Sequence, residues 1–123
     1  MDEKNNMTAC KVLRSSCEGG EQRKIVMGRE RDSLVVRECT EGELTKAIFG
    51  DYRHDHSLRL ARKQEEEVAR LANVGAAAQA LQAFFGGTGR VLLDLEDWLD
   101  ANGVAFEYRS KTGEDVVFRP ARG

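Results

Sequence analysis

The segment from Thr88 to Pro120 constrains the fold of this chain more than any other, because it has the pattern of a helix, a stop and a hairpin. A helical run ends at Asn102-Gly103, a pair that commonly gives the left-handed exit of a helix. Two strand-like runs follow, 104–109 and 115–119, and Pro120 marks the end of strand pairing. The sequence therefore predicts that the domain ends in a helix and a β-hairpin.

An angular count at about 100° per residue divides this helix into two sides. The apolar residues fall within one arc of about 120°, namely Val91, Leu92, Leu95, Trp98 and Leu99. Trp98 lies at the margin of the arc, where a role in the core is favoured over a role as an interface anchor. The other side carries the four residues that we take as the candidate partner-binding surface, namely Leu93, Glu96, Asp97 and Asp100.

The first half of the chain alternates short apolar runs with Gly and Asp turns, which is typical of an antiparallel meander. The predicted strands are Cys10–Ser15, Lys24–Arg29, Leu34–Cys39, Leu44–Phe49 and Ser57–Ala61. In the third of these, Leu34 and Val36 share one face and Arg37 lies opposite, so we expect one covered and one solvated sheet face.

Residues 63–85 are rich in Glu, Ala, Leu, Gln and Arg, which favour a helix. Leu71, Val74, Ala78, Leu81 and Phe85 recur at three- and four-residue steps along one side. We favour one helix with a weak point at Gly75, although Asn73 could instead cap a second helix.

These patterns predict an α+β fold: an antiparallel β-meander of four or five strands packed against two helices, followed by a C-terminal β-hairpin. We expect residues 1–8 to form a flexible leader and residues 9–123 to form a single domain. The pattern does not decide whether the hairpin joins the main sheet.

Composition narrows the function classes. The formal net charge is −2, with 19 Lys and Arg against 21 Asp and Glu, which argues against a dominant nucleic-acid-binding surface. No apolar run approaches the about 20 residues that span a bilayer, and the polar start lacks the apolar core of a secretory signal. The cysteine count is odd, namely three, so a cytoplasmic location is the simplest expectation.

Four local patterns could indicate a catalytic or ligand-binding site, but none of them matches a specific motif. His54 and His56 would point to the same side of an extended segment near Asp51, but a metal site needs more ligands than these, and a solvated turn is favoured. A thiol–imidazole pair would need one of these histidines to meet Cys17 or Cys39, and nothing in the sequence places them together.

The glycine-rich segment 86–90 precedes a helix but follows another helix, so it lacks the context of a phosphate-binding loop. A basic strip could contact nucleic acid, although Glu65–Glu67 follow it and would cancel much of its field. That strip consists of Arg53, Arg59, Arg62 and Lys63.

We therefore expect a small cytoplasmic, non-catalytic protein-binding module without a cofactor, of the kind that acts as an inhibitor, immunity or regulatory protein. The expected partner is another protein, and an open sheet edge would also allow self-association. Two alternatives stay open: a metal-binding enzyme or sensor that uses Asp51, His54 and His56, and a nucleic-acid-binding protein that uses the basic strip.

Overall fold

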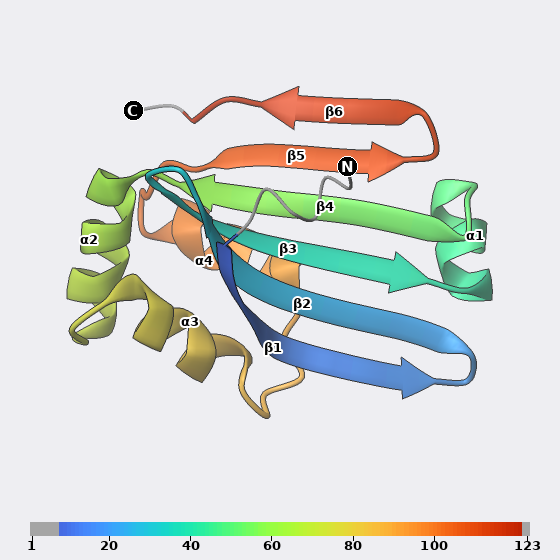
Figure 1. The fold of residues 1–123 in the computed structure, drawn as a ribbon, viewed down its shortest axis with the longest axis horizontal. Helices are drawn as coiled ribbons and strands as arrows, with labels where there is room; N and C mark the ends of the chain where they lie inside the picture. The colour runs from blue at the N-terminus through green and yellow to red at the C-terminus, as the bar shows by residue number, and fades with distance from the viewer. Residues whose placement is uncertain (1–7, 122–123) are drawn as a thin grey trace.

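Six strands form one antiparallel sheet in the computed structural model, which describes residues 8–121, and the strands follow one another in sequence order (Figure 1). The strands are β1 (Thr8–Glu18), β2 (Glu21–Glu30), β3 (Ser33–Glu41), β4 (Arg53–Leu60), β5 (Glu107–Thr112) and β6 (Asp115–Arg119). The helices are α1 (Glu43–Phe49), α2 (Arg62–Ala72), α3 (Ala77–Phe85) and α4 (Leu92–Ala101). The predicted α+β class, with a meander and a C-terminal hairpin, is confirmed.

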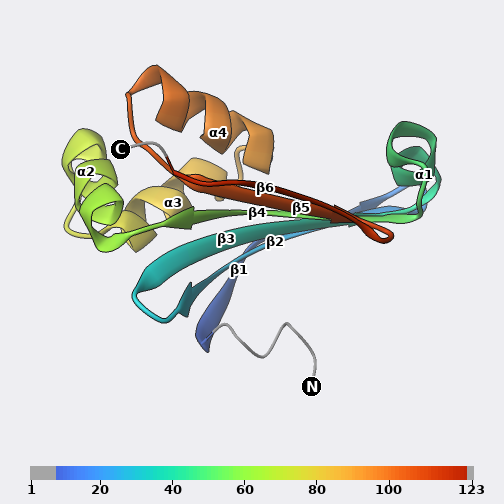
Figure 2. The ribbon, with the colours of Figure 1, turned by 90° about the horizontal axis from the view of Figure 1, so that it is seen from above.

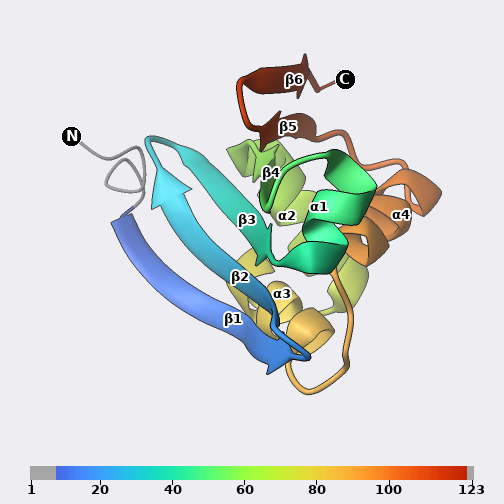
Figure 3. The same ribbon diagram turned by 90° about the vertical axis from the view of Figure 1, so that its right-hand side faces the viewer.

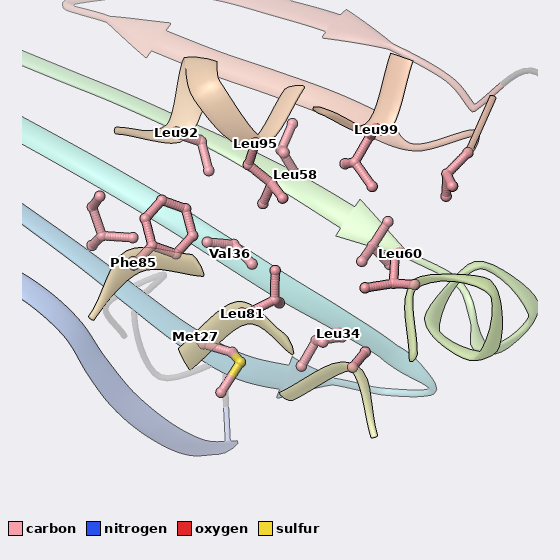
Figure 4. Close-up of a cluster of buried hydrophobic side chains, with 14 residues drawn as sticks. Met27, Leu34, Val36, Leu58, Leu60, Leu81, Phe85, Leu92, Leu95 and Leu99 are labelled. Atoms are coloured by element: carbon pink, nitrogen blue, oxygen red, sulfur yellow. The ribbon is translucent and has the colours of Figure 1, made fainter. Parts of the chain in front are cut away.

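The helices lie on one side of the sheet and leave its other face uncovered (Figures 2 and 3). The core fills the space between the two layers (Figure 4). α4 contributes Leu92, Leu95 and Leu99, each at most 1% exposed, as the angular count predicts. They pack with residues of α3 and with the covered face of the sheet, namely Leu81, Phe85, Ile25, Met27, Leu34, Val36, Leu58 and Leu60. Trp98 is partly buried and packs against this cluster.

The C-terminal hairpin joins the main sheet, because β5 pairs with β4. His56 lies opposite Ser110, and Leu58 lies opposite Tyr108. The sequence pattern could not decide this question, since the two strands are separated by three helices.

One predicted strand, Leu44–Phe49, is wrong: this segment is helix α1. Short apolar runs fit a strand and a helix equally well, and the preceding backbone decides between them. Gly42 has φ 145°, which turns the chain away from the sheet after β3. The carboxylate of Glu21 then accepts hydrogen bonds from the N–H of Leu44 (3.2 Å) and from the hydroxyl of Thr45.

The single helix favoured for 63–85 is also wrong, and the fold has four helices rather than two. Asn73 adopts the left-handed conformation (φ 56°) and its N–H bonds to the carbonyls of Ala69 and Arg70, which ends α2. Asparagine tolerates this conformation better than most residues, so the chain breaks here rather than at Gly75. Val74 is consequently 37% exposed and does not extend the apolar stripe.

Several boundaries differ from the predicted ones, and three of these differences matter here. β4 begins at Arg53 rather than at Ser57, so both histidines lie in a strand and not in a solvated turn. β5 begins at Glu107, three residues later than predicted. Within the expected leader, Thr8 begins β1, and residues 1–7 lie outside the described residues.

The close approach at Gly42 leads to a first prediction. A Cβ atom there would meet the Glu21 carboxylate and would lie 2.9 Å from the carbonyl oxygen of Gly20. We expect Gly42→Ala to lower the free energy of unfolding by about 1–3 kcal/mol, because strain adds to the displaced carboxylate. Urea denaturation at pH 7 measures this cost. The matched control is Gly19→Ala, since a Cβ at Gly19 (φ 58°) meets nothing within 4 Å. An equal loss in both variants would contradict the steric argument.

Candidate functional site

One face of the sheet has no described helix packed on it, and we call it the uncovered face (Figure 2). Its side chains alternate with those that point into the core. The central strands contribute Lys24, Val26, Arg37, Cys39, Glu41, Arg53 and Asp55, all of which line one groove of about 680 Å³. β5 continues the face, because Lys111 lies opposite Asp55 and Arg109 lies opposite Ser57.

The carboxylates on this face are held by two arginines of β4. The Arg53 guanidinium lies 2.9 Å from Asp55 and 3.8 Å from Glu41. The Arg59 guanidinium lies 3.0 Å from Glu107 and also contacts Glu30. These two arginines contact all four carboxylates, but their two positive charges offset only two of the four negative charges.

The remaining cations on this face make no salt bridge with any described residue. They are Lys24, Arg37, Arg109 and Lys111. Lys24, Arg109 and Lys111 are exposed and Arg37 is half-buried. Arg109 packs over the ring of Phe118, 5.5 Å from its centre. The uncovered face therefore carries a local positive excess, although the chain as a whole is slightly acidic.

The thiol–imidazole pair that the sequence did not favour is not assembled. Cys17 and Cys39 line the groove on the uncovered face, whereas His54 and His56 lie on the covered face of the same sheet. Burial, together with a hydrogen bond to Asp55 and its charge, raises the pKa of Cys39 to about 12. The thiol is therefore protonated at neutral pH and is a poor nucleophile.

A buried charged cluster lies on the covered face, around Glu38, which is 3% exposed. Its Oε1 lies 2.5 Å from His56 Nε2, and its Oε2 lies 2.8 Å from the Arg23 guanidinium. The N–H of Leu92, at the start of α4, also donates to Oε2 (3.1 Å). Burial by itself raises the pKa of Glu38. The hydrogen bond to His56 and the charges of His56 and Arg23 lower it by more, so the pKa is about 2. Both oxygens are occupied, so the cluster joins α4 to three strands.

The residues of the metal alternative do not meet at one point. His54 is buried, its ring stacks on Phe49 with centres 3.7 Å apart, and its Nδ1 lies 2.6 Å from Thr112 Oγ1. Burial, and to a smaller degree the charge of His56, lowers the pKa of His54. Asp51 instead accepts a hydrogen bond from the N–H of Arg53 (3.2 Å). Within residues 8–121, no three side chains of His, Cys, Asp or Glu are placed to hold a metal ion.

The predicted surface on α4 is present in part. Leu93 is 57% exposed, and Asp97 and Asp100 are exposed. Glu96, which we expected in solvent, is only 8% exposed, and its Oε1 lies 3.7 Å from the Arg119 guanidinium of β6. The angular count misplaced it because β6 extends the sheet beneath this side of α4. Burial raises the pKa of Glu96.

The glycine-rich loop before α4 is tied to its neighbours rather than open. The Arg14 guanidinium donates to the carbonyls of Gly89 and Arg90, both at 2.8 Å. The Arg90 guanidinium packs over the Phe84 ring, 4.5 Å from its centre. A shallow depression of about 430 Å³ lies between this loop and Trp98.

The basic strip is not one continuous patch. Arg53 and Arg59 lie on the uncovered face near opposite ends of β4, six residues or roughly 20 Å apart, and both are ion-paired. Arg62 and Lys63 are exposed at the start of α2.

No protein-family model matches the sequence, and neither a curated protein nor a solved structure is significantly similar to it. Within the described residues, no helix has the length and apolar character that crossing a bilayer requires.

Proposed function

We propose that this protein is a non-catalytic protein-binding module, and that its uncovered sheet face docks an acidic segment of another protein. The observation that carries the proposal is the excess of positive charge on this face, beside the groove. Arg53 and Arg59 contact the four carboxylates of that face, and four further cations lie beside them, so the six cations exceed the carboxylates by two positive charges.

A groove bordered by such cations attracts carboxylates at long range and can hold them at short range. The apolar side chains nearby add area that a partner can bury, since Val26 lines the groove and Phe118 is 47% exposed. A protein segment is favoured over nucleic acid because Asp55 and Glu41 also line the groove and would repel a continuous phosphate backbone.

The test compares two variants with the same change in net charge. Lys24→Glu with Arg109→Glu reverses two exposed cations of the uncovered face, and Arg62→Glu with Lys63→Glu reverses two exposed cations of α2. Each immobilised protein is incubated with a nuclease-treated lysate of its own cells, and captured proteins are quantified by mass spectrometry. We expect a specific set of partners whose yield falls at least tenfold in the first variant and is unchanged in the second.

Circular dichroism of both variants controls for folding. Equal yields from both variants would contradict docking on this face, and so would capture that is seen only in a parallel lysate without nuclease. A third variant, Asp97→Lys with Asp100→Lys, tests the surface of α4. If only this variant loses the partners, the protein-binding function stands and the docking surface is α4.

A further inference from the structure

The outer edge of β6 is open and apolar. All five residues of the strand are exposed, including Val116 (60%), Val117 (51%) and Phe118 (47%). β6 is the last strand of the sheet, so one row of its N–H and C=O groups has no partner strand. Proteins commonly protect such edges with charges, bulges or covering elements, because an apolar edge is a template for another strand.

The opposite edge, β1, carries these protections. Its pairing with β2 is interrupted twice, between Thr8 and Lys11 and between Val12 and Arg14. Lys11 and Arg14 lie in these irregular stretches; Lys11 reaches Gln82 of α3 (3.1 Å), and Arg14 reaches the loop before α4. The pairing of β6 with β5 is uninterrupted from Tyr108 to Thr112. Of the two edge strands, β1 is irregular and tied to other elements by its cations, whereas β6 is regular and exposed. β6 is therefore the edge that can pair with another strand.

The sequence of β6 is complementary to itself in the antiparallel direction. When Val117 faces Val117 of a second copy, Asp115 lies opposite Arg119 and Val116 lies opposite Phe118. Opposite residues then share a face of the sheet, which places two opposite-charge pairs at the ends and apolar pairs between them. The Arg119 guanidinium packs over the Tyr108 ring, 4.5 Å from its centre, and lies 3.7 Å from Glu96, but its side chain is 64% exposed and can also pair with Asp115 of a second copy.

We propose that two copies of this chain associate through antiparallel pairing of their β6 strands about a two-fold axis at Val117. The pairing makes one continuous sheet with the helices of both copies on the same side. The uncovered faces also become continuous, and Phe118 of each copy lies beside Val116 of the other. A five-residue strand buries less than the about 1,600 Å² of a standard interface, so we expect a dissociation constant in the range of about 10–100 µM.

The test is sedimentation velocity of the full chain over about 5–500 µM, and it uses charge swaps that the proposed register makes specific. Asp115→Arg places two arginine pairs across the axis, and Arg119→Asp places two aspartate pairs there. Each variant alone should dimerise about tenfold more weakly than the wild type. An equimolar mixture of the two should dimerise as strongly as the wild type, because both end pairs again have opposite charges.

Two further variants complete the design. Val117→Lys, which brings two like charges together on the axis, should abolish the dimer, and Ser15→Arg on the β1 edge should leave it unchanged. Rescue in the mixture cannot come from a folding defect, since it requires both copies to be folded. A chain that stays monomeric up to 500 µM overturns the proposal and leaves the edge for a strand of another protein. A dimer that survives Val117→Lys, or a mixture without rescue, overturns it as well.

Discussion

Replacing Glu38 by Gln should lower the free energy of unfolding at pH 7 by about 3 kcal/mol, because it removes the carboxylate that lies between Arg23 and His56. The glutamine amide keeps the shape of the side chain and one acceptor, so the loss is chiefly electrostatic. The side chain of Glu38 is 4% exposed and that of His56 is 12% exposed, and water can therefore replace little of the lost interaction.

The same residue sets an expected pH dependence. The folded state lowers the pKa of Glu38 from 4.5 to about 2. A carboxyl with a lowered pKa contributes stability that is fully present above its unfolded pKa and is lost as the pH falls through its folded pKa. We therefore expect the wild type to lose about 3 kcal/mol from this group between about pH 5 and pH 2.

Urea denaturation at pH 7, 4 and 2 checks both statements. Because the glutamine amide of the variant does not titrate, the difference between the wild type and Glu38→Gln should shrink as the pH falls and should nearly vanish at pH 2. Glu66→Gln is the matched control, since Glu66 is exposed on α2 and its replacement should cost less than about 0.5 kcal/mol. A difference that is the same at every pH would contradict the assigned charge interaction.

Glu38 is a charged residue at a position where the sequence pattern predicts the core, and the pattern alone does not identify its partner. It follows Leu34 and Val36 at alternate positions of β3, on the face that the pattern assigns to the core. A charged residue at such a position needs a buried partner. His56 could not be named as that partner, because the pairing of β3 with β4 spans α1, which the sequence pattern assigned to a strand.

The uncovered face could be predicted as a class of surface but not as a site. Alternation along 34–39 correctly places Leu34 and Val36 on the covered face, whereas Val35 on the opposite face is only 3% exposed, against the expectation of a solvated face. The groove, however, depends on the register of four strands, and Lys111 lies opposite Asp55 only because β5 adds to β4 after a long crossing through three helices. Local pattern contains no information on that pairing.

The predicted helix boundaries were wrong for a different reason, because single residues determine where these helices begin and end. A left-handed Asn73 divides α2 from α3, and a turn at Gly42 makes α1 a helix. Both residues were visible as turn formers, but propensity alone does not say which of several candidates the tertiary structure uses.

Two leucines of α4 should differ strongly in their contribution to the free energy of unfolding. Leu95 is 1% exposed and packs in the core, whereas Leu93, two residues earlier on the same helix, is 57% exposed. We expect Leu95→Ala to lower the free energy of unfolding by about 2–5 kcal/mol, through lost burial and a cavity that the sheet cannot fill. Leu93→Ala should change it by less than about 0.5 kcal/mol. Both values come from urea denaturation at pH 7.

The two substitutions remove the same atoms, so comparing them distinguishes a role of α4 in stability from a role in partner binding. If Leu93 is part of a docking surface, Leu93→Ala lowers the yield of captured partners while the free energy of unfolding stays unchanged. If it is an incidental exposed leucine, both quantities stay unchanged, and the apolar side of α4 serves the fold alone. Similar losses of stability in the two variants would instead mean that α4 is rotated on the sheet, because only one of the two side chains can face the core at a separation of about 200°.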